Sequence, residues 1–328
     1  MVKAGGVLVL GLLLSVWACA PRPPGLERIT FLTNYVFIGR HAPFFVGLDK
    51  GFYREAGFDV QILPATGSAL VVSSLEGGQA DYGMAEAASV VQAVGKGARV
   101  KAFGVYIDRT TSGLASLVPF VEPSAISGRR VAASLTDSAR VILPIVLVQA
   151  GVDTASIQWL PADPSTYFSL LLTERADLTT ASIDSDVPAL RRVAEPQGRQ
   201  VHFASFADWG YDVYGYFLVT QAERIASRPD QVRRFASATA RSVQYALEHD
   251  EEAAQSVSRH SPALDEATAL AQWRESMRAL RTADTAEHGY GVATPERLQR
   301  TIDLVKTAFA LDAAPTPDSV FADGFMPR

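Results

Sequence analysis

Cysteine is nearly absent from this chain of 328 residues, which contains one, Cys19. A single cysteine excludes an intramolecular disulfide framework and any cysteine cluster that would hold zinc or an iron–sulfur centre. Histidine is also sparse: the five histidines include no pair with the H-x-H or H-x-x-x-H spacing of metal ligands. We therefore expect neither a metal site nor a cofactor.

Positive charge is limited as well. The 30 basic residues are outnumbered by 35 acidic residues, the formal charge is −5 at pH 7, and no run rich in Lys or Arg occurs. A protein that binds nucleic acid carries a basic surface, so this class of partner is disfavoured. Hydrophobic residues make up 48% of the chain, which is typical of a folded protein, and the length suffices for two domains.

The one long apolar run lies near the N-terminus, where residues 7–17 read VLVLGLLLSVW. The run is too short to cross a bilayer, which needs about 20 helical residues, so it indicates an export signal. The following stretch, Val16-Trp17-Ala18-Cys19, resembles a bacterial lipobox, in which the cysteine receives a lipid. We predict a lipoprotein signal peptide over residues 1–19, with lipidation at Cys19.

The competing interpretation of this region is cleavage at an A-x-A site, Ala18-Cys19-Ala20. Pro21 would then follow the cleaved bond, which disfavours that processing. In the preferred interpretation, the proline-rich residues 20–26 form an extended tether between the lipid and the folded chain.

From Ile29 onward, short apolar strands alternate with amphipathic helices. One set runs from a strand at 29–35, through a helix from Pro43 to Tyr53, to a strand at 100–107. A second set runs from 129–133 to 201–206. Such alternation indicates βαβ units and parallel sheets. The fold class is α/β with two lobes, and the C-terminal third is predicted to be helical over 228–249, 251–260, 264–280 and 295–308.

Four stretches of the chain stand in a distinctive order: HAPFFVG (41–47), TGS with GGQADYG (66–68 and 77–83), ISGRRVA (126–132) and FADWGYDVYG (206–215). In this order they resemble the periplasmic solute-binding proteins of ABC importers for taurine, nitrate, alkanesulfonates and thiamine-pyrimidine precursors. The resemblance covers nearly all of the chain after the export signal. It adds a family to the α/β pattern derived from the residues alone.

The resemblance implies a two-lobed periplasmic-binding-protein fold of type II, with parallel-rich sheets flanked by helices and a ligand held between the lobes. The lobes of such proteins close over the ligand by hinge motion. By the same resemblance, the crossing strands are 112–118 and 214–220. Lobe I then comprises 27–115 and 217–328, and lobe II comprises 116–216.

The function implied by the resemblance is that of a substrate-binding component, not an enzyme. Its partners are a small-molecule ligand and the permease and ATPase subunits of the importer. We expect a monomer in the periplasm, anchored to the membrane by lipid. A eukaryotic branch of this family makes the thiamine pyrimidine with an iron-binding cysteine motif, which this chain lacks; a sensor ectodomain or a binding protein without a transporter is a third interpretation.

Ligands in open parallel sheets bind beyond the carboxyl ends of the strands. Together with family position, this rule nominates a set of ligand-binding candidates: Asn34, Tyr35, Phe37, His41, Thr66, Gly67, Ser68, Glu86, Tyr106, Arg109, Thr136, Asp184, Trp209 and Tyr214. Several have a plain structural alternative, since Thr66-Gly67-Ser68 is also typical of a helix N-cap and Trp209 and Tyr214 are typical of a core.

Two ligand classes fit these candidates. A heteroaromatic ring would stack between Tyr35 and Trp209, with Glu86 or Asp184 accepting its N–H groups. An anion such as a sulfonate, nitrate or aromatic carboxylate would instead recruit Arg40 or Arg109 with the helix that begins at Ser68. The 206–215 stretch resembles the pyrimidine-precursor branch most, so the heteroaromatic solute is preferred.

Overall fold

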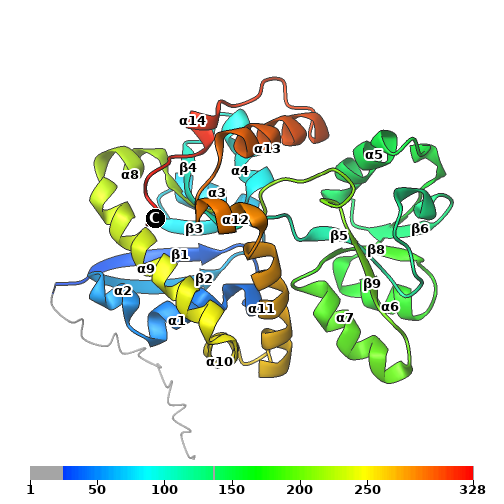
Figure 1. Ribbon diagram of the computed structural model, residues 1–328, viewed down its shortest axis with the longest axis horizontal. Helices are drawn as coiled ribbons and strands as arrows, with labels where there is room; N and C mark the ends of the chain where they lie inside the picture. Colours follow the sequence, from blue (N-terminus) through cyan, green and yellow to red (C-terminus); the bar gives the residue numbers. More distant parts are fainter. Residues whose placement is uncertain (1–24, 136, 328) are drawn as a thin grey trace, which may run out of the picture.

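The computed structural model describes residues 25–135 and 137–327, which form two lobes joined by two crossings of the chain (Figure 1). The predicted signal peptide, Cys19, most of the tether and Thr136 lie outside the described residues. Each lobe is built on one five-stranded sheet flanked by helices. The predicted α/β class with two lobes is confirmed.

The sheet of lobe I has the strand order β2-β1-β3-β10-β4. Its strands are β1 (Glu27–Thr33), β2 (Phe58–Pro64), β3 (Tyr82–Glu86), β4 (Val100–Ile107) and β10 (Tyr216–Gln221). Strands β1, β2 and β3 pair in parallel, whereas β10 is antiparallel to β3 and β4. The reversed strand is the one that returns from the other lobe, so the sheet is mixed.

The sheet of lobe II repeats this plan with the order β7-β6-β8-β5-β9. Its strands are β5 (Ser112–Ser116), β6 (Arg130–Ala133), β7 (Gln158–Pro161), β8 (Leu178–Ser182) and β9 (His202–Ser205). Strand β5, the first to enter this lobe, is antiparallel to both β8 and β9. In each sheet the strand that arrives from the other lobe is therefore inserted next to an edge strand.

Helices cover both faces of the lobe I sheet. The helices of lobe I that precede β10 in the chain are α1 (Ala42–Asp49), α2 (Phe52–Glu55), α3 (Ser68–Glu76) and α4 (Ala87–Gly95). Residues of β1 alternate between the faces: Phe31 packs with Phe44 and Phe235 on one side, and Leu32 packs with the cluster that contains α3 and α4 on the other. This alternation follows from the period of two along a strand.

The C-terminal third is helical, as predicted, and packs mainly on lobe I (Figure 1). Its helices are α8 (Ala222–Ser227), α9 (Pro229–Glu248), α10 (Asp250–His260), α11 (Glu266–Leu280), α12 (Ala283–His288), α13 (Pro295–Ala308) and α14 (Pro317–Val320). Lobe II carries α5 (Ala139–Gln149), α6 (Tyr167–Leu172) and α7 (Asp186–Ala194). No helix of the described chain is long and apolar enough to span a bilayer.

The chain crosses between the lobes in segments 108–111 and 206–215, just before the strands predicted as crossings. The predicted crossing 112–118 begins with β5, a strand of the lobe II sheet, and the predicted crossing 214–220 contains β10 of the lobe I sheet. The two segments are hydrogen-bonded to each other, because Thr110 N donates to Val213 O at 3.0 Å. Next to this contact, Gly215 N donates to the carbonyl of Ile107, the last residue of β4, also at 3.0 Å. They form a short, paired hinge.

Candidate functional site

A cleft of about 620 Å³ lies between the lobes. Lobe I contributes Asn34, Tyr35, Arg40 and Tyr216 to its lining. Lobe II contributes residues from the start of α5, from the turn after β7, and from the end of β8 into α7. These include Ser112, Asp137, Ser138, Asp163, Ser165, Tyr167, Phe168, Thr180, Ser182, Ser185, Asp186 and Phe206.

The carboxyl ends of strands supply much of this lining. Asn34 and Tyr35 follow β1, the 163–165 turn follows β7, and Ser182 ends β8. The rule that ligands bind beyond the carboxyl ends of strands in open α/β sheets thus holds on both sides of the cleft. Of the candidates predicted from the sequence, Asn34 and Tyr35 line it.

His41 orients the amide of Asn34. His41 is fully buried, and its Nδ1 accepts the backbone N–H of Ile38 at 3.2 Å. Burial, together with the charge of Arg40, holds the pKa of His41 well below its usual range, so the ring is neutral. The proton therefore sits on Nε2, which donates to Asn34 Oδ1 at 3.2 Å. Because Oδ1 is engaged, Asn34 is left with its Nδ2 donors for the cleft.

Arg40 is the one cationic residue of the cleft lining, and its side chain is 4% exposed. It comes from the short 3₁₀ helix η1 (Gly39–His41), and its Nη2 donates to Asp184 Oδ1 of lobe II at 3.0 Å. Burial, the largest single effect, lowers the pKa of Arg40, but Asp184, Tyr216 and Glu86 together outweigh it and raise the pKa, so the guanidinium stays charged. Its Nε and Nη1 are buried and have no hydrogen-bond partner.

Asp184 is a second buried member of this junction between the lobes. Its carboxylate accepts from Ser182 Oγ at 2.8 Å and from Ser276 Oγ of α11 at 2.9 Å, besides Arg40. These contacts occupy the carboxylate within the protein. Asp184 therefore supports Arg40 and does not line the cleft, although it was a candidate acceptor for the ligand.

Asp137 stands at the start of α5 and is fully engaged in hydrogen bonds. Its Oδ1 accepts the backbone N–H of Ala139 at 2.9 Å, and its Oδ2 accepts from the hydroxyls of Thr180 at 2.6 Å and Tyr167 at 3.4 Å. A carboxylate thus already occupies the N-terminal turn of this helix, where a free anion would otherwise bind.

Asp186 begins α7 on the same wall. Its Oδ2 accepts from Ser182 N at 2.7 Å and Ser185 Oγ at 3.2 Å, while no described residue donates to its Oδ1. Burial raises the pKa of Asp186, and Arg40 partly offsets this effect. The free oxygen makes Asp186 a ready acceptor at the cleft.

A smaller cavity of about 40 Å³ adjoins the cleft and shares Ser112, Ser138 and Tyr216 with it. It contains Glu86, whose carboxylate accepts from Tyr216 Oη at 3.4 Å and whose pKa is raised by burial. The hydroxyl of Tyr211 is buried here without a hydrogen-bond partner. Of the candidates predicted from the sequence, Glu86 and Tyr214 line this cavity and not the main cleft.

The other aromatic candidates have structural partners. Phe37 packs edge-on against Phe45, and Tyr106 is fully buried with its hydroxyl donating to Arg40 O at 2.5 Å. Trp209 packs near Phe120 and Phe206 and donates from Nε1 to Val121 O at 2.8 Å. Trp209 thus does not line the cleft, so the predicted stack between Tyr35 and Trp209 finds only Tyr35 there.

The remaining candidates also lie outside the main lining. The loop of Thr66, Gly67 and Ser68 starts α3, and Ser68 Oγ accepts the backbone N–H of Glu86 at 3.0 Å. Arg109 lies at the hinge, where it pairs with Asp208 at 2.9 Å and Asp212 at 3.4 Å. The Ser68 hydroxyl thus contacts the end of β3 and does not cap α3, whose N-cap is Gly67 without a side-chain cap. Arg109 is held by two carboxylates of the 206–215 segment.

Sequence reasoning missed several cleft residues, above all Asp186, Tyr167 and Tyr216. Tyr216 sits on β10, which was interpreted as a crossing, and Tyr167 begins a helix, where an aromatic residue is typical of a core. Asp186 offered a signal: it ends a Ser-Ile-Asp-Ser-Asp run that begins at Ser182, the last residue of β8.

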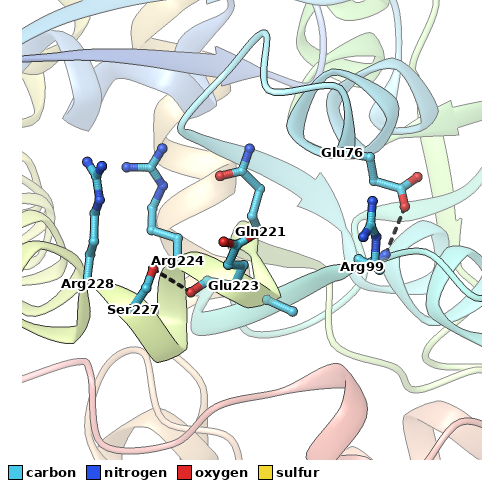
Figure 2. Close-up of a pocket in the computed structure, with 8 residues that line it drawn as sticks. Glu76, Arg99, Gln221, Glu223, Arg224, Ser227 and Arg228 are labelled. Atoms are coloured by element: carbon cyan, nitrogen blue, oxygen red, sulfur yellow. Dashed lines mark hydrogen bonds between the residues drawn. The ribbon is translucent and has the colours of Figure 1, made fainter.

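A second pocket, of about 380 Å³, lies on lobe I at α8 and is lined by Arg99, Arg224 and Arg228 together with Glu76 and Glu223 (Figure 2). Arg224 is held within the protein by Asp81 and by Gln231 Oε1 at 2.7 Å. The charges of both signs largely compensate one another there. Within 25–135 and 137–327, no group of three or more His, Cys, Asp or Glu side chains is placed to hold a metal ion.

Comparison with curated proteins finds short matches. The 4-amino-5-hydroxymethyl-2-methylpyrimidine phosphate synthase of Schizosaccharomyces pombe is 31% identical over 91 residues, which is 28% of this chain and 26% of that protein. The THI11 synthase of Saccharomyces cerevisiae is 29% identical over 88 residues, 27% of this chain and 26% of that protein. The match therefore spans about a quarter of the length of these relatives.

Comparison with solved structures covers nearly the whole chain. The aliphatic sulphonate binding protein SsuA of Escherichia coli superposes with a TM-score of 0.70 at 12% identity, covering 92% of this chain and 94% of that one. A Candida albicans protein with the generic periplasmic binding protein fold gives a TM-score of 0.61 at 14% identity, covering 90% and 93%. The fold is thus that of periplasmic binding proteins.

The family comparison extends over most of the folded chain. Residues 39–253 match the family described as NMT1/THI5 like. This range includes η1 with Arg40, the whole of lobe II and the hinge segments, so it contains almost all of the cleft. The chain belongs to the NMT1/THI5-like family.

Proposed function

We propose that this protein is the substrate-binding component of an ABC importer and captures a small heteroaromatic solute, such as a thiamine pyrimidine precursor, between its lobes. The observation that carries the proposal is the polar cleft of about 620 Å³ lined by both lobes, which are joined by a paired hinge. A cleft of this size suits a small molecule.

Aromatic side chains in the cleft support a planar solute. Tyr35, just after β1, is 51% exposed, and Tyr167, Phe168, Phe206 and Tyr216 also line the cleft, with the guanidinium of Arg40 over the ring of Tyr216. Ring faces beside a desolvated cleft favour stacking on a planar ligand. The curated relatives are pyrimidine phosphate synthases by name, which supports a pyrimidine as the planar group.

An anionic solute is the second candidate. The two unpartnered nitrogens of Arg40, Nε and Nη1, favour it, and several structural neighbours are sulfonate-binding proteins by title. A pyrimidine synthase is a weaker alternative. The chain has only Cys19, which stands in the predicted export signal, so it lacks the cysteine motif expected of that activity.

The partners and location follow from the same proposal. The protein delivers its solute to permease and ATPase subunits, works as a monomer in the periplasm, and is tethered to the membrane through a lipid on Cys19. Incorporation of labelled palmitate into the wild-type protein, and its loss in Cys19→Ala, is the expected result for the tether.

The ligand is tested by a thermal-shift screen of pyrimidines, other thiamine precursors, sulfonates and aromatic acids, followed by calorimetry. A solute that binds only the folded state stabilises it by RT ln(1 + [L]/Kd), about 2.7 kcal/mol at a hundredfold excess over Kd. We expect a pyrimidine to raise the melting temperature and to reduce the radius of gyration in solution scattering. If no small solute of the screen binds, the proposed function is wrong.

A further inference from the structure

The two walls of the cleft have opposite polarity. The lobe I wall offers hydrogen-bond donors: Asn34, whose amide is held with Nδ2 free, and Arg40, whose Nε and Nη1 have no partner. Among the residues that the structure describes, Arg40 is the one cation of the lining, and no carboxylate of lobe I lines the main cleft. This wall therefore suits an acceptor atom of the solute.

The lobe II wall carries three carboxylates and no cation. Asp137, Asp163 and Asp186 line the cleft there. Asp186 keeps Oδ1 free, and Asp163 uses only Oδ1 to accept from Ser165 N at 2.9 Å and Ser165 Oγ at 2.6 Å. A group that donates hydrogen bonds, or carries positive charge, is favoured against this wall.

A plain anion meets an obstacle in the same place. The N-terminal turn of α5 borders the cleft, but the Asp137 carboxylate already accepts its Ala139 N–H. A sulfonate or nitrate placed there would approach the Asp137 carboxylate, and the repulsion between the two negative charges costs binding energy. The positive charge of Arg40 alone does not offset the negative charge of the lobe II wall, because its Nη2 is already paired with Asp184.

We propose that the cleft selects a dipolar solute, with an acceptor group facing Arg40 and Asn34 and an amino or ammonium group facing Asp186. This inference rests on the proposed binding function and deepens it by setting the orientation and the chemical class of the solute. The buried Arg40 binds the acceptor end of the solute, since its Nε and Nη1 otherwise remain without a hydrogen-bond partner at a ligand-sized cleft. The carboxylate of Asp186 selects the amino or ammonium group at the other end of the solute.

The test uses pairs of probes that differ by one amino group. The pairs are taurine with ethanesulfonate, and 4-amino-2-methylpyrimidine with 2-methylpyrimidine, each titrated by calorimetry into the wild-type protein. A charge-assisted hydrogen bond to Asp186 should make the amino member of a pair bind about tenfold or more tightly. Equal or reversed affinity within a pair that binds overturns the inference.

Two nearly isosteric variants, one on each wall of the cleft, test the two contacts separately, and a third serves as the control. Asp186→Asn should abolish the preference for the amino member, whereas Asp230→Asn, which removes a highly exposed carboxylate of α9, should leave it unchanged. Asn34→Asp keeps an oxygen that accepts from His41 and replaces the free donor by an acceptor, so it should weaken the binding of both members of a pair to the same extent. A preference that survives Asp186→Asn overturns the inference.

The outcomes also distinguish this inference from the proposed function. If a probe or another solute of the screen binds without any dependence on its N–H groups, the binding function stands and the dipolar selection is wrong. If a binding solute carries both groups and loses affinity in Asp186→Asn, both are supported. If nothing in the screen binds, the proposed function itself fails.

Discussion

At the scale of single residues, the pair formed by Arg40 and Asp184 is the most consequential contact. The two side chains are 4% and 0% exposed, come from different lobes, and meet at 3.0 Å. Burying both charges is costly, so the pair contributes little net stability compared with an apolar pair. Its role is geometric: it holds the guanidinium at the cleft and ties the lobes together there.

Removing one partner of this pair should destabilise the protein strongly. Asp184→Asn leaves the charge of Arg40 buried without its carboxylate, and we expect a loss of about 3–5 kcal/mol in the free energy of unfolding. Urea denaturation measures it. The surface variant Asp230→Asn should change stability by less than about 0.5 kcal/mol. A loss in Asp184→Asn no larger than that of the control would contradict the assignment.

At the scale of elements, the hinge depends on the close approach of its two segments. Gly215 stands where a Cβ atom would lie 2.6 Å from Arg109 O and 3.0 Å from Ile107 Cγ2. Its N–H bonds to Ile107 O, and the neighbouring carbonyl of Val213 bonds to Thr110 N. Any side chain at Gly215 therefore pushes the two crossing segments apart.

Gly215→Ala is expected to lower stability by about 1–3 kcal/mol, the cost of inserting a methyl group into a packed site. Thermal unfolding measures this, and solution scattering should detect an altered separation of the lobes. Gly95→Ala, at the end of α4, is the matched control. Its new Cβ would lie 3.3 Å from the flexible tip of the Leu311 side chain and at ordinary contact distances from Pro315 Cδ, at 3.5 Å, and Ala313 O, at 3.7 Å. Equal effects of the two substitutions would refute a special role for the hinge glycine.

At the scale of the whole molecule, a second junction joins the lobes along α7 and α11 (Figure 1). Arg191 of lobe II pairs with Glu275 at 3.2 Å, Arg192 pairs with Asp265, and Gln272 Nε2 donates to Ser185 O at 3.2 Å. Together with the hinge and the buried pair of Arg40, these contacts hold the lobes in the arrangement described. Lobe motion must break or stretch them.

The Asp265 contact predicts a pH dependence. Hydrogen bonds from Arg192 outweigh burial and lower the pKa of Asp265 to about 2. A carboxyl group with a lowered pKa in the folded state stabilises that state above its ordinary pKa, near 3.8, and this contribution is lost as the pH falls towards 2. The pair is half exposed, so we expect a contribution of about 1 kcal/mol or less.

Asp265→Asn should therefore have a lower free energy of unfolding than the wild type at pH 6, and the difference should shrink as the pH falls from about 4 through about 2. Urea denaturation across this range measures it, because a guanidinium salt would itself screen the ion pair. Asp230→Asn should show a smaller difference at pH 6, since its partner Arg233 lies on its own helix. A difference between Asp265→Asn and wild type that grows on acidification would contradict the sign of the effect.

Local patterns were enough to predict most elements but not all their limits. The predicted helices 228–249, 251–260 and 295–308 correspond closely to α9, α10 and α13, because long amphipathic periods are strong signals. The predicted helix from Pro43 to Tyr53 is instead α1 and α2, separated at Gly51, whose φ of 77° only glycine adopts easily. Short helices such as α12 and α14 carry too few turns to show a period.

The sequence by itself determined the α/β class, the two lobes, the family, and the strand ends that place Asn34 and Tyr35 at the cleft. Those properties depend on periodicity and on motif order, which are local along the chain. The tertiary structure decided which side chains meet: Arg40 with Asp184, Asp137 with Thr180, and Trp209 with lobe II instead of the ligand. Such meetings depend on β5 and β10 being inserted between strands distant in sequence, and pairing across that distance leaves no periodic signal.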